Sequence, residues 1–386
     1  MEPARAAAGP SLAAVQPVLD ARTAAVRAGD REAWAATIDP NAPAAFRDEQ
    51  LAEFDGLHSL PLATYALTAR LDDSGDLSRA AGTKYGAPVY LPETRQVLRF
   101  DGYDDRDAVD SLWLTFVQRG DRWYVAADDD LSGLGLDTAR GLWDFGPVAV
   151  LRTDHFLVLH HPAQAERARA LASIGEDAIA TLDRRWDEPW PGRIPMVLPG
   201  SVDELEKMLQ STIDLDKFVA FVSYGAVRDD GWVATAPRIY VQDGNLSKYS
   251  RAYQVQTLVH ELSHAAAAPL AGPFVPAWVH EGIADWVAKG RATDERAPTG
   301  NEGHLPRDYE FSTGSQSAII RSYSEARSAV SYLSARAGVG APTAFLTALG
   351  DPKVAPGSVD FHVDQALRQS AGVGLADLEH GWLTRR

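Results

Sequence analysis

The sequence has no cysteine among its 386 residues. It therefore has no disulfide framework, no thiolate metal site and no cysteine nucleophile. It also has no run of about 20 apolar residues, the length that a membrane-spanning helix needs, so we expect no membrane-spanning segment. The first residues, MEPARAAAGPSLAAV, lack the basic start and apolar core of a signal peptide. Their small side chains predict a disordered lead-in over residues 1–10.

Basic residues are too few to form a nucleic-acid-binding face. The chain has 37 Lys and Arg against 53 Asp and Glu, for a formal net charge of -16. Because binding to phosphates requires a basic face, we expect no nucleic-acid partner. The acidic balance is typical of a well-solvated surface. A 45% hydrophobic composition is ordinary for a globular protein, and the length suffices for two domains with separate cores.

The first part of the chain begins with helical spacing and continues with alternating segments. Apolar residues recur at helical intervals over residues 17–39, and Gly29-Asp30 separates two helices. Alternation then predicts strands, with Gly120-Asp121 as a hairpin turn before the last of them. The predicted strands cover residues 63–71, 95–103, 110–120 and 121–130. Helices followed by a curved antiparallel sheet predict an α+β cone.

This order of elements, ending in the hairpin LTFVQRGDRWYVAADDD, resembles the NTF2-like (SnoaL-like) superfamily over residues 11–145. The resemblance implies an accessory domain, because family members are often ligand-binding or interaction modules. A Gly-rich segment, GLGLDTARGLWDFGPV, follows as the expected linker. We therefore expect an NTF2-like domain over 11–145 and a second domain over 146–386.

The stretch TLVHELSHAAAAP, residues 257–269, has histidines four positions apart within an expected helix. Residues four apart lie about one turn apart on the same helix face, so His260 and His264 can direct their imidazoles at one metal ion. Glu261 is rotated about 100° from His260 and can reach a water at the metal without being a ligand. This spacing favours zinc with Glu261 as the general base. The alternative is a polar helix face with ordinary histidines.

A second motif, PAWVHEGIADWVA, follows as another helix with an apolar face. Glu281 would complete two histidines and one carboxylate, the three protein ligands of a catalytic zinc that leaves a fourth position for water. Asp285 lies one turn beyond Glu281. It can accept the remaining N–H of a ligand histidine and fix that histidine's tautomer. The alternatives are a solvated carboxylate for Glu281 and a salt-bridge partner for Asp285.

These two motifs resemble those of the gluzincin metallopeptidases, which combine HExxH with a later glutamate. HEGIADW is similar to the E-G-x-x-D segment of thermolysin-type enzymes, and PAWVHEGIADW to the W-x-x-E-G-x-A stretch of M1-aminopeptidase-like and peptidase MA-like proteins. The resemblance covers roughly residues 148–386 and implies a zincin-like α+β domain. Carried over by position, it makes His260, His264 and Glu281 the zinc ligands and Glu261 the general base, and makes Asp285 the carboxylate that supports a ligand. The Gly-rich exopeptidase motif of M1 enzymes is absent.

A hydrogen-bond donor for the transition-state oxyanion comes from a later helix by the same resemblance. The segment RSYSEARSAVSYLSARAGVG is similar to the Y-x-x-A…YL…G helix of peptidase MA-like proteins, whose leading tyrosine faces the zinc. The resemblance thus makes Tyr323 the donor, with a core or rim aromatic as the alternative. Tyr309 and His304, on the segment between the motifs, are competing candidates that we expect on surface loops.

Together these features predict a gluzincin-type zinc metallopeptidase that binds one zinc ion per chain and acts on a peptide or protein substrate. Two alternatives stay open: a peptidase-like binding or regulatory protein without turnover, and a ligand-binding NTF2-like protein with a structural zinc. Because many relatives of this type are exported, the resemblance favours an extracytoplasmic location, with a signal or anchor removed, over a cytoplasmic one. The sequence fixes neither the oligomeric state nor the choice between endo- and exopeptidase action.

Overall fold

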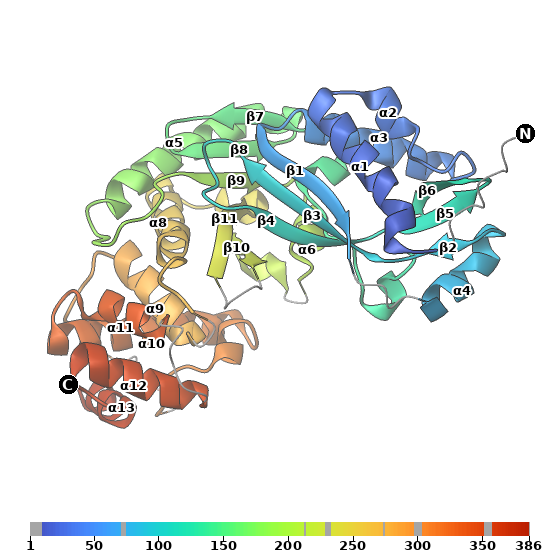
Figure 1. Cartoon of the computed structure of the whole chain (residues 1–386). Helices are drawn as coiled ribbons and strands as arrows, with labels where there is room; N and C mark the ends of the chain where they lie inside the picture. Colours follow the sequence, from blue (N-terminus) through green and yellow to red (C-terminus); the bar gives the residue numbers. More distant parts are fainter. Residues whose placement is uncertain are drawn as a thin grey trace, which may run out of the picture. The chain divides into compact units, whose positions relative to one another are not determined.

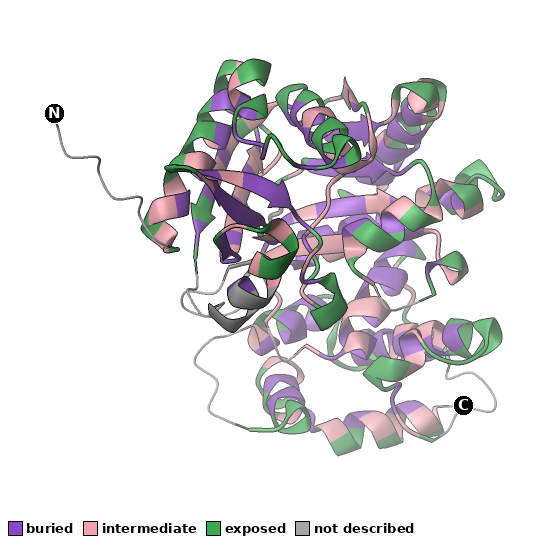
Figure 2. Ribbon diagram, turned by 90° about the vertical axis from the view of Figure 1, so that its right-hand side faces the viewer, coloured by how far each residue is buried: buried purple, intermediate pink, exposed green. Residues whose placement is uncertain are grey.

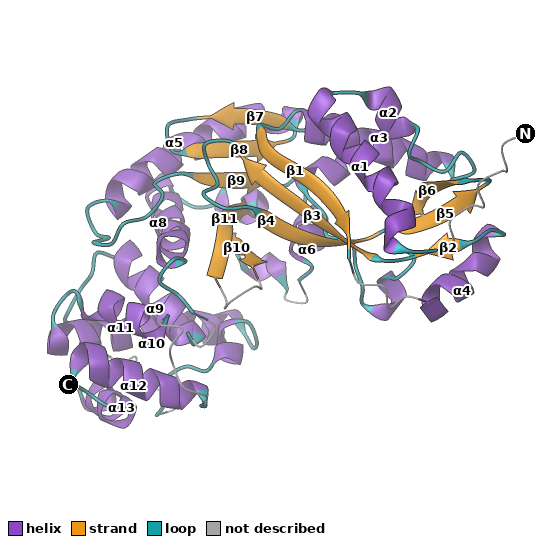
Figure 3. Ribbon diagram, in the orientation of Figure 1, coloured by secondary structure: helices purple, strands orange, loops and turns teal. Residues whose placement is uncertain are grey.

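The computed structural model describes residues 10–70, 75–211, 214–227, 233–272, 275–296, 303–350 and 357–385. Its secondary structure is mixed, with helices and small sheets, which confirms the predicted α+β class (Figures 1 and 3). Residues 1–9 of the predicted lead-in lie outside the described residues. The predicted NTF2-like and zincin-like arrangements stay predictions.

The chain forms two compact units that differ in outline from the predicted domains. The first unit comprises Met1–Leu151, Leu159–Ala165 and Pro199–Ser211. The second comprises Arg152–Val158, Glu166–Leu198 and Thr212–Arg386. Two later segments therefore belong to the first unit, an assignment that the linear order of motifs does not suggest.

Helices and two three-stranded sheets make up the first unit. The helices are α1 (Leu12–Ala28), α2 (Arg31–Ala35), α3 (Ala44–His58), α4 (Gly75–Tyr85) and α6 (Val202–Leu209). One sheet has the order β1-β3-β4, from Leu62–Ala69, Glu93–Phe100 and Ala108–Trp113. The other has the order β2-β5-β6, from Val89–Tyr90, Thr115–Arg119 and Arg122–Ala127. Short 3₁₀ turns are η1 (Ser132–Leu134), η2 (Leu142–Phe145) and η3 (Pro162–Gln164).

The prediction of one continuous strand over residues 110–120 is wrong. The chain leaves the β4 pairing after Trp113, and β5 begins at Thr115 in the other sheet. The Trp113 backbone N–H donates to the Thr138 hydroxyl, so a side chain replaces the ladder partner at the point where the chain changes sheets. The expected hairpin at Gly120-Asp121 is present, because β5 and β6 pair antiparallel and Gly120 adopts φ 65°, a left-handed conformation that suits glycine.

A five-stranded sheet has the order β10-β11-β9-β8-β7. Its strands are β7 (Ala149–Arg152), β8 (Phe156–His160), β9 (Ile194–Leu198), β10 (Ala220–Val227) and β11 (Val233–Val241). β11 pairs parallel with β9 but antiparallel with β10, so β10 is an antiparallel strand at the edge of the sheet. The sequence patterns did not predict β10. The turn η4 (Leu215–Lys217) precedes it.

Apart from its strands, the second unit is mainly helical (Figure 1). Its helices are α5 (Ala165–Leu182), α7 (Asp243–Leu246), α8 (Arg251–Ala267), α9 (Ala277–Ala288), α10 (Gln316–Ala337), α11 (Ala341–Leu349), α12 (Val359–Ala371) and α13 (Leu375–Thr384), with η5 (Asp308–Phe311) between α9 and α10. Buried, intermediate and exposed residues are distributed along the helices (Figure 2), and α9 has no exposed residue. Across the described ranges, no helix has the length and apolarity needed to cross a bilayer.

Gly282 allows α9 and α10 to pack closely. A Cβ atom built at Gly282 would lie 2.7 Å from the Ala326 carbonyl oxygen and 2.9 Å from a methyl group of Val330. Real side chains do not approach a backbone oxygen so closely, so any larger residue would push the two helices apart. The glycine directly after Glu281 thus determines how near that residue lies to α10.

Candidate metal centre

The helix α8 presents both motif histidines on one face. Ser250 begins the helix, and its hydroxyl accepts a hydrogen bond from the Tyr253 backbone N–H, which satisfies one of the free N–H groups at the helix start. Leu258 and Leu262 are fully buried on the core face. The i, i+4 spacing then brings the two imidazoles together, with ring centroids 4.7 Å apart and planes at 82°.

The helix α9 brings Glu281 to these histidines. Most of its residues are buried, including Val279 and Ile283, which fixes the rotation of the helix about its axis. Asp308, in the turn η5, accepts a hydrogen bond from the Ala277 backbone N–H at 2.8 Å, so it satisfies a free donor at the first turn of α9. The chain folds back after α8, and Glu281 lies against the HExxH face as the motif predicted.

Three ligand-type atoms converge at this point. His260 Nε2 lies 3.1 Å from Glu281 Oε2 and 3.1 Å from His264 Nε2. His264 Nε2 lies 3.4 Å from the same Glu281 oxygen. These three residues could hold a metal ion. Among the residues that the structure describes, no other group of histidines and carboxylates has this arrangement.

The dimensions of this triangle suit a small tetrahedral metal ion. For ligand–metal distances of about 2.0–2.2 Å, the ligand atoms of a tetrahedral site stand roughly 3.3–3.6 Å apart. Of the three separations in this structure, 3.4 Å falls within that range and the two of 3.1 Å lie slightly below it. Two imidazole nitrogens and one carboxylate oxygen are also ligand types that zinc accepts.

The charges around the cluster favour an ion pair when no metal is bound. Burial opposes protonation of His260, but its hydrogen bond to Glu281 and the charges of Glu261, Glu281 and Asp285 outweigh burial and raise its pKa to about 9. For Glu281, burial favours the neutral acid, yet the nearby histidines reverse this and hold the pKa of the carboxyl well below its usual range. The carboxylate is therefore ionised, as a ligand must be.

Glu261 is buried beside the cluster and is not one of its three members. Burial raises the pKa of the Glu261 carboxyl, and Glu281 raises it further, while His260 and His264 oppose the shift. A carboxyl with a raised pKa is better suited to exchange protons near neutral pH than an ordinary glutamate. This placement agrees with the role expected of the glutamate in HExxH.

Tyr323, on α10, reaches the same site. Its ring centroid lies 6.0 Å from that of His260, and its ring meets Phe311 edge to face at 5.3 Å. Burial, the carboxylates Glu281 and Glu261, and a hydrogen bond to Glu281 raise its pKa well above the ordinary value, so the hydroxyl keeps its proton. His260, His264, Glu281 and Tyr323 line one pocket of about 500 Å³. The competing candidates do not line it, because Tyr309 is 55% exposed and His304 is hydrogen-bonded to the Leu305 carbonyl.

Asp285 lies one turn beyond Glu281, as predicted, but its main partners are the cationic side chains of Arg327 and Lys289. Its Oδ2 accepts from Arg327 Nη1 at 2.5 Å and from Lys289 Nζ at 3.1 Å. Its Oδ1 lies 3.9 Å from His260 Nδ1, which is within ion-pair range but longer than a hydrogen bond. The expected hydrogen bond from His260 to Asp285 is therefore not formed in this structure.

Several residues at the site were missed by the sequence analysis. Tyr224, on the edge strand β10, lines the pocket, and burial together with the charges of Glu261 and Glu281 raises its pKa. His280 lines it as well, and burial lowers the pKa of His280 to about 4, so its imidazole is neutral. Arg327 joins Asp285 to Glu295. Of these three, only Tyr224 lay outside the quoted motifs, whereas His280 stood next to Glu281 and Arg327 four residues after Tyr323.

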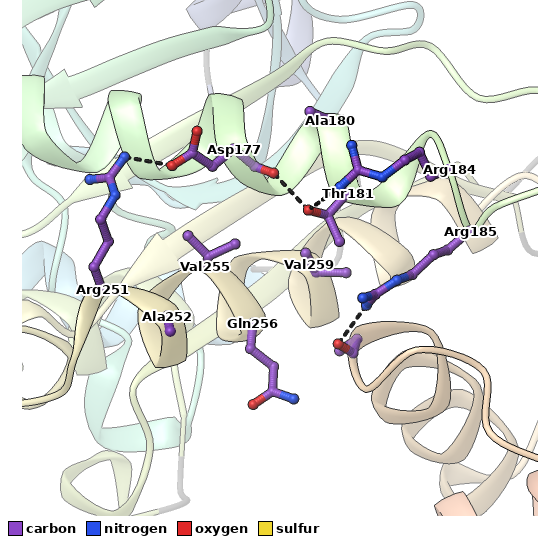
Figure 4. Close-up of a pocket in the computed structure, with 11 residues that line it drawn as sticks. Asp177, Ala180, Thr181, Arg184, Arg185, Arg251, Ala252, Val255, Gln256 and Val259 are labelled. Atoms are coloured by element: carbon purple, nitrogen blue, oxygen red, sulfur yellow. Dashed lines mark hydrogen bonds and ion pairs between the residues drawn. The ribbon is translucent and has the colours of Figure 1, made fainter.

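A separate groove of about 610 Å³ lies between α5, the first turns of α8 and the end of α9 (Figure 4). Its floor includes Val255 and Val259, and Arg251 at one end forms an ion pair with Asp177 at 2.6 Å. Arg185, at the other end, donates to the Val287 and Ala288 carbonyls and so caps the C-terminus of α9. These charged groups are occupied in holding helices together, and the groove contains no metal-type cluster among the described residues.

The comparisons with known proteins assign no family to the chain. No protein-family model matches the chain, and no curated protein matches it.

Proposed function

We propose that this chain is a zinc-dependent hydrolase of peptide bonds. One observation carries the proposal: His260, His264 and Glu281 converge in a pocket of about 500 Å³ that Glu261 and Tyr323 also line. A metal-type triad, a buried carboxyl and a protonated hydroxyl in one cavity are the groups that metal-assisted hydrolysis needs.

The donor set favours zinc in a catalytic site over zinc in a structural one. A structural zinc is closed by four protein ligands, whereas the cluster has three members within the described parts of the chain. Three ligands leave a position for substrate or water. A zinc ion held by His260, His264 and Glu281 supplies Lewis-acid polarisation of a peptide carbonyl.

Glu261 is the general base of the proposed reaction. It takes a proton from the water whose oxygen bonds to the carbonyl carbon, and it delivers that proton to the leaving nitrogen as the C–N bond breaks. The water is thus divided between the new carboxyl group and the new amine, and Glu261 returns to its starting state. Its buried position and raised pKa support both proton transfers.

Tyr323 is the proposed donor to the carbonyl oxygen as negative charge develops on it. A donor of fixed orientation stabilises the transition state more than the ground state. The raised pKa of Tyr323 supports this role, because the hydroxyl stays protonated near neutral pH. Its contact with Phe311 holds the ring in one orientation.

Metal analysis together with peptide cleavage tests the proposal. Purified protein is expected to hold close to one zinc ion per chain, to cleave peptides from a diverse library, and to lose that cleavage with a chelator. His264→Ala is expected to lose the zinc. Equal zinc content in wild type and His264→Ala would place the metal elsewhere and overturn the proposal. His304→Ala is the matched control, because His304 does not line the pocket.

A further inference from the structure

The groove between α5 and α8 has a basic rim around an apolar floor (Figure 4). Val255 and Val259 lie between the two helices, with Arg251 at one end of the groove and Arg184 and Arg185 at the other. These three arginines share the described lining with a single carboxylate. The whole chain has a formal net charge of -16, so this surface has the opposite sign to the protein as a whole. Its charge therefore complements an acidic partner.

Arg184 has a charge that no carboxylate balances within the described parts of the chain. Its hydrogen bond goes to the Thr181 hydroxyl at 3.2 Å. The carboxylates next to it in sequence have other partners, because Asp183 accepts from an indole N–H and Asp187 forms an ion pair at 2.7 Å. Burial lowers the pKa of Arg185, and the charge of Arg184 lowers it further, so the two guanidinium groups repel each other. A carboxylate from another molecule would relieve this repulsion.

The ion pair at the opposite end of the groove is weak. Arg251 and Asp177 lie 2.6 Å apart, but both side chains are more than half exposed. Exposed pairs contribute little to stability, because water and salt screen them. Arg251 can therefore exchange Asp177 for an incoming carboxylate at little cost in free energy.

The length and the open apolar surface of the groove suit a peptide chain. Arg251 and Val259 are eight positions apart on α8, which corresponds to about 12 Å. An extended chain covers that length with about four residues. Val255 is half-buried, and Ala180 and Ala252 are exposed, so apolar surface is left open along the groove. A bound segment can bury this surface with its own apolar side chains.

A second copy of this chain fits the groove less well. A two-fold symmetric dimer places the same surface of each subunit against the other. The arginines of the rim would then face the same arginines of the second copy, and like charges across an interface are unfavourable. The charge of the rim thus favours a different, acidic molecule.

We propose that this groove docks an extended acidic segment of a partner protein, with its apolar side chains on Val255 and Val259 and a carboxylate at Arg184. The groove shares no described lining residue with the pocket of the metal cluster. The docked segment is therefore distinct from any chain bound at the metal, and the proposal does not depend on the proposed hydrolase activity.

Selection from a random-peptide display library tests the proposal. The bait is the Glu261→Gln protein, so that bound peptides are not cleaved. We expect the selected peptides to combine apolar residues with at least one Asp or Glu, and we expect Val255→Glu in the same background to abolish their selection. Failure to select any peptide, selection of peptides without acidic residues, or selection that Val255→Glu leaves unchanged would overturn the proposal.

Fluorescence anisotropy of a selected peptide gives a second measurement. Arg184→Glu is expected to weaken binding by roughly 3–10-fold, because it replaces an exposed attractive pair with a repulsive one. Arg169→Glu, an exposed charge reversal on α5 outside the groove, is the matched control and should leave the affinity unchanged. Equal affinities of wild type and Arg184→Glu would contradict the docking site.

Two further controls keep the result interpretable. Thermal unfolding shows whether Val255→Glu is folded, and Ala252→Glu, at an exposed position of the same groove, replaces it if it is not. Sedimentation measures the oligomeric state. A dimer of wild-type protein that Ala252→Glu dissociates would assign the groove to a second copy and overturn the proposal, whereas the proposal expects the same oligomeric state for both.

Discussion

Arg327 donates to one oxygen of Asp285 and leaves the other oxygen of that carboxylate 3.9 Å from the Nδ1 atom of His260. Arg327 and Tyr323 lie one turn apart on α10, so this ion pair ties the proposed oxyanion donor's helix to the helix that carries Glu281. Arg327 also donates to Glu295. Burial lowers the pKa of the Arg327 guanidinium, but the charges and hydrogen bonds of Asp285 and Glu295 outweigh burial and raise it. The pair is a partly buried anchor beside the metal cluster.

Asp285→Asn is expected to weaken zinc affinity by less than the roughly 10–100-fold that follows loss of a carboxylate hydrogen-bonded to a ligand histidine, because Asp285 stands 3.9 Å from His260 Nδ1 and acts on it through charge alone. The asparagine also loses its ion pair with Arg327. A competition titration with a chromogenic chelator measures the affinity. Unchanged affinity would mean that Asp285 only anchors α9 to α10. Combining the change with Arg327→Met should give less than the sum of the two single effects, since both act on the same carboxylate.

Glu261→Gln is expected to keep the fold and the zinc but to reduce hydrolysis by several orders of magnitude, because the amide cannot accept the proton of the attacking water. Zinc content, thermal unfolding and kcat are measured on the same preparation. Glu206→Gln, an exposed change on α6, is the control and should match wild type. A Glu261→Gln variant that cleaves peptides as fast as wild type would exclude Glu261 as the base.

Tyr323→Phe is expected to reduce kcat by about 10²–10³-fold, the scale of losing one oxyanion donor. KM should change little, because the hydrogen bond strengthens mainly in the transition state. The ring and its contact with Phe311 are preserved, so the zinc content should be unchanged. Tyr309→Phe is the matched control, since Tyr309 is exposed and outside the pocket. Steady-state kinetics that show equal kcat for both variants would return Tyr323 to a packing role.

Gly282→Ala is expected to destabilise the second unit by roughly 1–3 kcal/mol, the usual cost of overpacking. The added methyl group would meet the Ala326 carbonyl oxygen, so α9 must move and Glu281 must move with it. Gly82→Ala is a control within a helix, where the nearest atom to the new methyl group is 3.5 Å away. There the change should be neutral or stabilising, because alanine favours helix. Calorimetry measures the unfolding temperature of both variants, and a zinc titration measures their zinc affinity. Equal unfolding temperatures for Gly282→Ala and wild type would contradict the prediction.

The first unit is expected to lose stability as pH rises from about 5 to 8. Burial raises the pKa of Glu53 to about 8, with Arg22 opposing and Asp144 and Asp128 reinforcing the shift. Because the folded state holds a proton that the unfolded state releases above its ordinary pKa of 4.5, the stabilisation is complete below that pH and is lost as pH approaches 8.

The slope attributable to Glu53 is at most about 1.4 kcal/mol per pH unit. Glu53→Gln cannot release the proton and should flatten the profile, so its advantage over wild type should grow with pH. Glu49→Gln, on the exposed face of the same helix, should leave the profile as it is. Thermal unfolding at half-unit pH intervals measures all three. Parallel wild-type and Glu53→Gln profiles would contradict the assignment.

The sequence alone determined the elements that depend on local spacing. Four-residue spacing placed His260 and His264 on one face of α8, because that spacing is set by the helix itself. The apolar pattern around Glu281 likewise predicted α9. The hairpin at Gly120 followed from a turn residue between alternating segments. Each of these depends on contacts within a few residues, which a sequence displays directly.

Tertiary structure decided what depends on contacts between distant segments. The strand β10 carries Phe221 and Tyr224, which line the pocket, yet its sequence, AFVSYGAV, lacks the regular alternation that predicts a strand. Arg327, 42 positions after Asp285, reads in the sequence as a charge on a helix surface. Only the packing of α9 against α10, which Gly282 permits, makes it a partly buried partner of that carboxylate. The same packing brings Tyr323 beside His260. The contacts of a side chain with other helices depend on how the helices assemble, and the sequence of its own helix does not display them.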